Sequence, residues 1–167
     1  MKNNKLTSKN TLKRLFDFNF GVITLILLIL PMLFISLFVI ASSRGPVFHW
    51  SKRIGLKGCV FEMPKFRSML IDTPPVATHL LDNPDSYLSP VGGLLRRASL
   101  DELPQLWSII KGDMSFVGPR PALFNQEDLI LLRKKHNIDM LIPGITGWAQ
   151  VNGRDKLSIP EKVELDQ

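Results

Sequence analysis

The chain has 167 residues, a formal net charge of +6 and one cysteine. This length suits one small domain beside an apolar segment, and a single cysteine excludes an intrachain disulfide and fits a reducing compartment. The positive charge is concentrated before residue 18, in Lys2, Lys5, Lys9, Lys13 and Arg14. A nucleic-acid footprint would be spread over a folded face. The distribution therefore argues against nucleic acid and favours anionic lipid as the partner of these charges.

Residues 18–43 contain no charged side chain and are mostly Leu, Ile, Val and Phe. A membrane-spanning helix needs roughly 20 such residues, so we predict a membrane segment here. Pro31 lies near its middle, where it removes a backbone donor and clashes with the preceding turn. Cations flank both ends, and the positive-inside rule draws both flanks to the cytoplasm. Two alternatives stay open from the residues alone: a re-entrant helix broken near Pro31, or a spanning helix that tolerates the proline.

Short strands and loops are expected directly after the membrane segment. Residues 46–63 indicate a β-hairpin closed by a glycine-containing turn. Lys65 and Arg67 follow, and they share one face if this stretch is extended. Prolines and small polar residues predict a long loop over 72–90, with a short helical turn at 77–81.

Helical spacing of apolar residues predicts one helix over 99–111, ending at Gly112, and a second over 126–135. The basic residues 133–135 suit the negative end of the helix dipole and are expected to be solvated. The predicted fold class is α+β. Residues 1–45 form a basic flank and a membrane helix, and residues 46–167 form a small, mainly helical domain with a short hairpin and interfacial helices.

A serine and an acid stand at the start of the first predicted helix. Ser99 as the N-cap and Glu102 at the third helical position match a capping box. A generic helix could carry this pair for stability alone. Pro104 does not fit a start optimised only as a helix, because it loses an intrahelical hydrogen bond.

The functional interpretation of the same stretch is phosphate chemistry. A carboxylate such as Asp101 can attack phosphorus and form an acyl phosphate. Glu102 points elsewhere around the helix and would hold Mg²⁺, which prefers one or two carboxylates together with phosphate oxygens. Arg96 and Arg97 would supply counter-charge. We expect the capping role of Glu102 and the catalytic role of the pair to hold at once.

Two later segments carry candidate binding residues. The prolines of the turn at 118–121 would hold Arg120 ready for bidentate contact with phosphate, although a purely structural turn is an equal alternative. Residues 143–154 combine three glycines with an aromatic ring, two amides and an arginine, which could cradle a nucleotide. The alternative is that the aromatic ring plugs a local core.

The order and residue sequence of five segments resemble those of the bacterial sugar transferase family. These are the monotopic phosphoglycosyl transferases that begin glycan assembly on polyprenyl phosphate. The segments are KRLFD at 13–17, PKFRSM at 64–69, SLDELPQL at 99–106, KGDMSFVGPRP at 111–121 and PGITGWAQVNGR at 143–154. As a set they are highly specific, and they extend over nearly the whole chain.

The resemblance implies transfer of a sugar-1-phosphate from a UDP-sugar to undecaprenyl phosphate, with release of UMP. It implies a covalent phosphosugar on Asp101, Mg²⁺ on Glu102 and lipid phosphate at Arg96. It also implies a re-entrant helix with both ends on the cytoplasmic side of the bacterial inner membrane. The substrate-binding residues expected from the residues and the resemblance together are Arg96, Arg97, Lys65, Arg67, Arg120, Trp148, Gln150, Asn152 and Arg154.

Two departures from the family pattern stand out. Leu30 precedes the membrane proline where some relatives have serine, and the family continues beyond Gln167 into an aromatic tail, so we expect a C-terminally shortened member. The alternative function is a truncated, non-catalytic membrane-anchored scaffold of the same fold. For the active enzyme we expect an N-acetylhexosamine donor, closely followed by a hexose, and a product that begins a bacterial surface glycan. A homo-oligomer and downstream glycosyltransferases are further expected partners.

Overall fold

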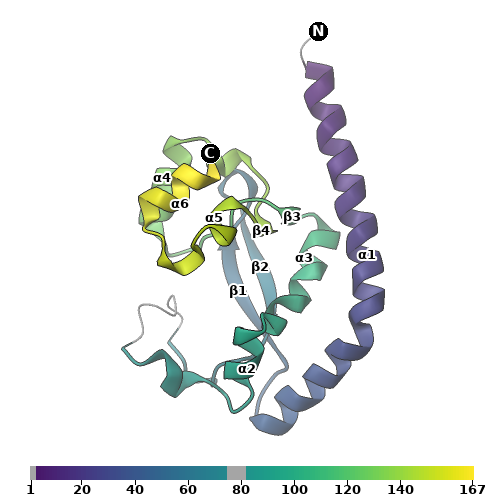
Figure 1. Cartoon of the computed structure of the whole chain (residues 1–167), viewed down its shortest axis with the longest axis vertical. Coiled ribbons are helices and arrows are strands. Elements are labelled where there is room, and N and C mark those ends of the chain that lie inside the picture. The colour runs from purple at the N-terminus through teal and green to yellow at the C-terminus, as the bar shows by residue number, and fades with distance from the viewer. Residues whose placement is uncertain (1–2, 75–81) are drawn as a thin grey trace.

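The structure is a computed structural model that describes residues 3–74 and 82–167. A helix of 40 residues, α1 (Asn3–Ser42), runs along one side of a small mixed domain, and the C-terminal helices lie on the domain's far side (Figure 1). The predicted α+β class is confirmed at this level. The helical turn predicted at 77–81 falls outside the described residues.

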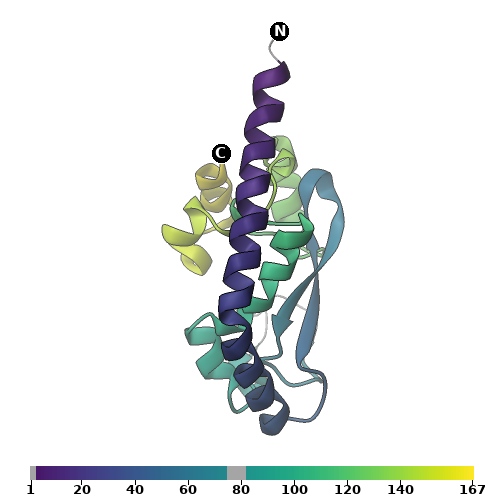
Figure 2. The same cartoon turned by 90° about the vertical axis from the view of Figure 1, so that its right-hand side faces the viewer.

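Helix α1 contains Pro31 and is continuous across it. The helix changes direction in its C-terminal part, as both views show (Figures 1 and 2). Proline lacks the backbone donor and crowds the preceding turn, which bends helices. The Ser36 hydroxyl donates to the Met32 carbonyl at 2.7 Å, a contact that also favours bending. The break predicted near Pro31 is therefore a bend within an uninterrupted helix.

Most of α1 presents apolar side chains that the domain does not cover. The stretch Thr11–Ser42 is long and apolar enough to cross a membrane, and little of it is buried inside the protein. Leu27, Leu33 and Leu37 are all exposed. An apolar surface of this extent is unfavourable in water and suits lipid, which suggests a membrane anchor.

Two basic residues of α1 attach it to the domain. The Arg14 guanidinium donates to the carbonyls of Ile109 and Ile110, both at 2.5 Å, and the Lys13 ammonium donates to the Val117 carbonyl at 2.9 Å. The last carbonyls of a helix have no intrahelical donor, so a cation is favourable there. Lys13 and Arg14 were predicted to belong to the basic flank of the membrane segment. In the structure they also bind backbone carbonyls of the domain.

The predicted hairpin is confirmed and is longer than expected. Strands β1 (Phe48–Ile54) and β2 (Val60–Phe66) pair antiparallel, joined by the 3₁₀ turn η1 (Leu56–Gly58). Lys65 lies inside β2, opposite His49.

The helix predicted over 99–111 is divided in two. A 3₁₀ helix, η4 (Leu100–Gln105), contains Pro104 and leads into α3 (Leu106–Lys111). Gly112 ends α3 with a φ of +99°, as predicted. The predicted capping box at the start of this segment was wrong. Ser99 is left-handed with a φ of +56° and makes no side-chain cap. The Glu102 carboxylate, the other half of the predicted box, is bound by basic residues of other elements.

A capping box does exist at the start of the last helix. Helix α6 (Ile159–Asp166) begins with Ser158, whose hydroxyl accepts from the Glu161 amide while the Glu161 carboxylate accepts from the Ser158 amide. The second predicted helix is confirmed as α4 (Glu127–Lys135). The remaining elements have these bounds: η3 (Pro84–Tyr87), α2 (Gly92–Arg97), β3 (Ser115–Val117), η5 (Ile138–Met140), β4 (Gly144–Thr146), α5 (Trp148–Val151) and η6 (Arg154–Lys156).

Three small apolar clusters hold these elements together. One joins α3 to β2 through Met63 and Ile109, with Leu25 and Leu28 of α1 packed against it. A second joins α4 to α6 around Leu129 and Val163. The third fixes the end of α1 on the hairpin and α2. Strands β3 and β4 pair in parallel between the clusters, so the turn after β3 and the segment after β4 lie close together.

Candidate functional site

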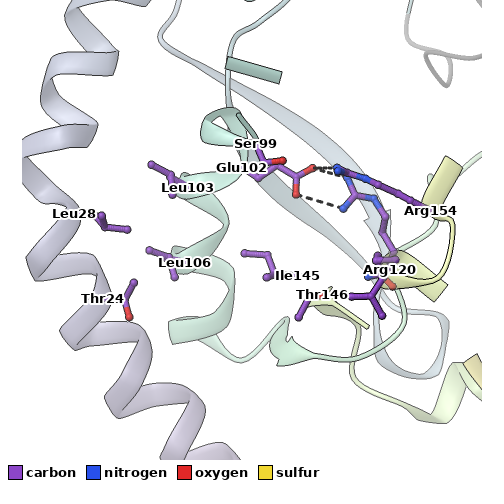
Figure 3. Close-up of a pocket in the computed structure, with 12 residues that line it drawn as sticks. Thr24, Leu28, Ser99, Glu102, Leu103, Leu106, Arg120, Ile145, Thr146 and Arg154 are labelled. Carbon is purple, nitrogen blue, oxygen red and sulfur yellow. Dashed lines mark hydrogen bonds and ion pairs between the residues drawn. The ribbon is translucent and has the colours of Figure 1, made fainter. Parts of the chain in front are cut away.

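A pocket of about 340 Å³ lies between α1, η4, α3 and the segments after β3 and β4. Figure 3 shows Thr24 and Leu28 of α1 facing Leu103 and Leu106 across one side of it. Glu102 points away from this apolar side toward two arginines (Figure 3). The pocket therefore has an apolar wall formed partly by α1 and a charged wall formed by the domain.

Glu102 is the centre of the charged wall. Its Oε1 lies 2.9 Å from the Lys65 ammonium and 2.5 Å from the Arg120 Nη2, while its Oε2 accepts from the Arg120 Nη1 at 3.4 Å. Arg154 approaches to 3.7 Å, and the Glu102 side chain is 13% exposed. Burial favours the neutral acid, but the hydrogen bonds from Arg120 and the charges of Lys65 and Arg120 outweigh it and lower the pKa of Glu102 to about 2. Glu102 is thus ionised at neutral pH.

Positive charge exceeds negative charge around this carboxylate. Burial, and then repulsion by the like charge of Arg120, lower the pKa of Arg53 to about 10, and the opposite charge of Glu102 partly offsets them. Burial likewise lowers the pKa of Lys65, again offset by Glu102. The basic groups Arg53, Lys65, Arg120 and Arg154 therefore surround the Glu102 carboxylate, and Lys65 also acts on Asp101. An anion is favourable beside such a group of positive charges.

The sequence analysis missed Arg53. In the hairpin register Arg53 pairs with Phe61 and His49 pairs with Lys65. Paired residues and every second residue of a strand share one face, so Arg53 and Lys65 lie on the same face of the hairpin. The alternation of side chains was visible in the sequence. The register that aligns Arg53 with Lys65 was not, because it depends on how the two strands pair across the turn.

Asp101 lies beside the pocket and does not line it. It is 6% exposed. Burial raises its pKa, Lys65 and Arg96 act to lower it, and the charge of Glu102 raises it further. The predicted pair of acids is therefore an unequal one, with a fully ionised Glu102 and a buried Asp101 that holds its proton more tightly than usual.

Gln150 lines the pocket from α5, as its predicted role in binding requires. Both polar atoms of its amide are buried and have no hydrogen-bond partner among the described residues. An unpaired buried amide is costly, and a polar ligand in the pocket would remove that cost.

The other predicted binding residues are not gathered at the pocket wall. The buried Arg67 guanidinium donates to the Ser43 carbonyl and hydroxyl at 2.6 and 2.9 Å, which anchors the end of α1. Arg97 is exposed and donates to Gly93. Trp148 is 64% exposed and does not plug a core, and the exposed Asn152 amide donates to its carbonyl.

Arg96 lies near Asp101 and away from the pocket wall. It donates to the Met69 sulfur at 3.6 Å, and its charge acts on Asp101. It belongs to the surroundings of the buried acid and does not line the pocket.

Mg²⁺ was predicted at Glu102. Among residues 3–74 and 82–167 there is no group of three or more His, Cys, Asp or Glu side chains that could hold a metal ion. Mg²⁺ commonly takes only one or two carboxylates and completes its shell with water and substrate phosphate. A charged Glu102 on the pocket wall fits that mode of binding, and it does not fit an ion held by protein ligands alone.

These features define a class of protein: a helix suited to a membrane, docked on a small domain whose pocket is built to receive an anion beside an apolar wall. The comparison with family models is consistent with this class. The model described as "Bacterial sugar transferase" matches residues 8–167. The chain belongs to this family, which confirms the resemblance noted in the sequence.

Curated relatives cover most of the chain. The "Uncharacterized sugar transferase EpsL" of Bacillus subtilis is 40% identical over 93% of this chain and 75% of the relative. The "UDP-glucose:undecaprenyl-phosphate glucose-1-phosphate transferase" of Escherichia coli is 40% identical over 92% of this chain and 34% of the relative. The "Undecaprenyl-phosphate galactose phosphotransferase" of Salmonella typhimurium is 34% identical over 95% of this chain and 36% of the relative. The chain thus spans about a third of the length of the last two.

Proposed function

We propose that this protein transfers a sugar-1-phosphate from a UDP-sugar to undecaprenyl phosphate and thereby begins a bacterial surface glycan. The observation that carries the proposal is the group of basic side chains around Glu102 in a pocket that α1 partly lines. A diphosphate suits these basic side chains, and a polyprenyl chain suits the apolar wall. Family membership and the names of the relatives support the same reaction.

The proposed chemistry has two half-reactions. In the first, a carboxylate oxygen of Asp101 attacks the phosphorus that bears the sugar, forming an acyl phosphate. The bond from that phosphorus to the bridging oxygen breaks, and UMP leaves with the electron pair. In the second, a phosphate oxygen of undecaprenyl phosphate attacks the same phosphorus, and Asp101 leaves as a carboxylate. The product is a lipid-linked diphosphate sugar.

The roles of the basic residues follow from charge. Arg120 and Arg154 on the pocket wall would bind the diphosphate oxygens of the UDP-sugar when it enters the pocket. Lys65 and Arg96, which act on Asp101 in the protein, favour the ionised carboxylate that attacks. Glu102 would hold Mg²⁺ together with substrate phosphate, and the ion would neutralise the charge of the leaving group. The amide of Gln150 would hydrogen-bond the nucleoside or the sugar.

The covalent intermediate gives the main test. The protein, purified in detergent, is incubated with Mg²⁺ and a panel of UDP-sugars labelled in the sugar: UDP-glucose, UDP-galactose and their N-acetylated counterparts. We expect label to remain on the denatured wild-type protein, with release of UMP. Asp101→Asn should retain no label, because an amide is not a nucleophile of this kind. Asp85→Asn, which changes an exposed aspartate of η3, is the matched control and should label normally.

Equal labelling of the wild type and Asp101→Asn would contradict the role of Asp101. No labelling and no UMP release with any donor would favour the alternative function, a non-catalytic membrane-anchored scaffold. The donor that labels best identifies the sugar. The relatives named above are described with glucose and galactose, whereas our expectation from the sequence is an N-acetylhexosamine.

A second prediction concerns the direction of α1 in the membrane. We propose that α1 is re-entrant and that both of its ends face the cytoplasm at the inner membrane, since cations flank both ends and the helix bends after its midpoint. Cys59 is exposed on the domain and reports the side of the domain. Asn4→Cys in a Cys59→Ser background reports the N-terminus.

A membrane-impermeant maleimide should label both cysteines in inverted membrane vesicles and neither in intact spheroplasts. Permeabilised spheroplasts, in which both cysteines are accessible, are the control. Labelling of the two positions from opposite sides would show that α1 spans the bilayer.

A further inference from the structure

Arg133 connects the turn that carries Arg120 to the last helix of the chain. From α4 its Nη1 donates to the Arg120 carbonyl at 2.7 Å, and its Nη2 donates to the Asp166 Oδ2 of α6 at 2.6 Å. The Arg133 side chain is 11% exposed and the Asp166 side chain 1%. The expectation that the basic residues 133–135 would be solvated was therefore wrong for Arg133.

The turn itself explains why the Arg120 carbonyl takes a side-chain donor. Proline stands on both sides of Arg120, and proline has no backbone N–H. The carbonyls of three successive residues are instead bound from outside the turn. The Pro119 carbonyl accepts from the Gly144 amide at 2.9 Å. The Arg120 carbonyl accepts from the Arg133 side chain, and the Pro121 carbonyl accepts from the Arg53 side chain at 3.2 Å.

The free energy needed to bury the Arg133–Asp166 ion pair indicates that the pair does more than stabilise the fold. Desolvating two charges is expensive, and a well-packed apolar pair in the same place is often as stable. An arginine, however, can donate two N–H groups in a fixed fork. Arg133 uses this fork to hold the backbone of Arg120 at a set distance from α6, and the Arg120 side chain then reaches Glu102.

We propose that Arg133 and Asp166 are positioning residues for Arg120: they fix its backbone so that its guanidinium meets the substrate diphosphate beside Glu102. This inference rests on the proposed function, because it assigns Arg120 a diphosphate to bind. Neither residue lines the pocket, so both act through Arg120.

A purely structural role for the pair is the competing explanation, since α4 and α6 also pack through Leu129 and Val163. The two explanations differ in the kinetic constant that changes. Loss of folded protein lowers kcat and leaves KM unchanged, because the remaining folded molecules are normal. A misplaced Arg120 raises KM for the UDP-sugar in fully folded protein.

The experiment uses the full chain in detergent, the best donor of the labelling panel, and undecaprenyl phosphate as the acceptor that allows repeated turnover. Asp166→Asn removes the charge at constant size, and Arg133→Lys keeps the charge without the fork. Glu164→Gln on α6 and Lys135→Gln on α4, both exposed, are the matched controls. For each variant we measure KM and kcat for UMP release, the thermal unfolding midpoint, and amide hydrogen exchange of peptides covering residues 117–123.

We expect Asp166→Asn and Arg133→Lys to raise KM about tenfold and to speed exchange in residues 117–123, while both controls match the wild type. In an Arg120→Lys background, Asp166→Asn should raise KM little further, because the effects of residues that act as a unit are not additive. An unchanged KM with a lowered midpoint, or additive effects, would overturn the proposal. If the wild type releases no UMP, the proposed function fails on its own, and unchanged exchange in residues 117–123 would then overturn the link between Asp166 and the turn.

Discussion

Replacing Glu102 with glutamine is expected to lower the free energy of unfolding by about 3 kcal/mol at pH 7 and to reduce UMP release at least about 100-fold. The first figure follows from the pKa of Glu102, which folding lowers from 4.5 to about 2. The reason is that a neutral amide at this position would leave Lys65 and Arg120 buried without their counter-charge. Urea unfolding followed by tryptophan fluorescence measures the first effect.

The same substitution has a defined pH dependence. Because the pKa of Glu102 is lower in the folded protein than in the unfolded chain, the carboxylate stabilises the fold fully above about pH 4.5 and loses this effect as the pH falls toward about 2. The difference in stability between the wild type and Glu102→Gln should therefore be constant from pH 5 to 7 and shrink in acid. Glu164→Gln, at an exposed position, is the control and should change stability by less than about 0.5 kcal/mol. A Glu102→Gln protein as stable as this control would show that the cations around Glu102 find other partners.

Replacing each of two adjacent glycines of α2 with alanine should change the free energy of unfolding in opposite directions. A Cβ on Gly92 would lie 1.8 Å from the Ser68 carbonyl oxygen and 2.8 Å from its carbon. This oxygen accepts from the Ser89 amide at 3.0 Å, so it cannot yield without breaking that bond. We expect Gly92→Ala to lower the free energy of unfolding by about 3 kcal/mol and to lower activity as well, since α2 carries Arg96.

Gly93→Ala is the matched control for this effect. The nearest atom to its added Cβ is the Leu88 Cδ1 at 3.7 Å, an ordinary contact. Alanine favours a helix over glycine by up to about 1 kcal/mol, so this variant should be as stable as the wild type or slightly more. Urea unfolding of the two variants side by side measures the contrast. Equal stabilities would mean that α2 shifts away from Ser68 at little cost.

The features predicted correctly are those that neighbouring residues determine. The uncharged stretch before Ser43 predicts the apolar helix, and Gly112 ends α3 because only glycine readily takes its left-handed conformation. The spacing of Leu129 and Leu132 with basic residues at the end predicts α4. These patterns repeat over one or two turns, so local physics suffices.

The errors share a different cause. A capping box was predicted at Ser99 and is found at Ser158, although both serines stand three residues before a glutamate. What separates them is the competition for the acid. Glu161 is exposed and binds Ser158, whereas the Glu102 carboxylate is surrounded by basic side chains from β2, the turn after β3 and η6. The tertiary structure overrides the local motif.

By itself, the sequence determined that this chain carries an apolar helix suited to a membrane, a small mixed domain and an acidic pair with basic residues and rigid turns to serve it. Only the tertiary structure decided which basic residues serve that pair: Arg53 and Lys65 through the hairpin register, and Arg120 through a turn held by Arg133. It likewise decided that Arg14 docks α1 on the domain. The physical reason is that a side chain's type is local, whereas its partner is set by pairing and packing between different elements of the fold.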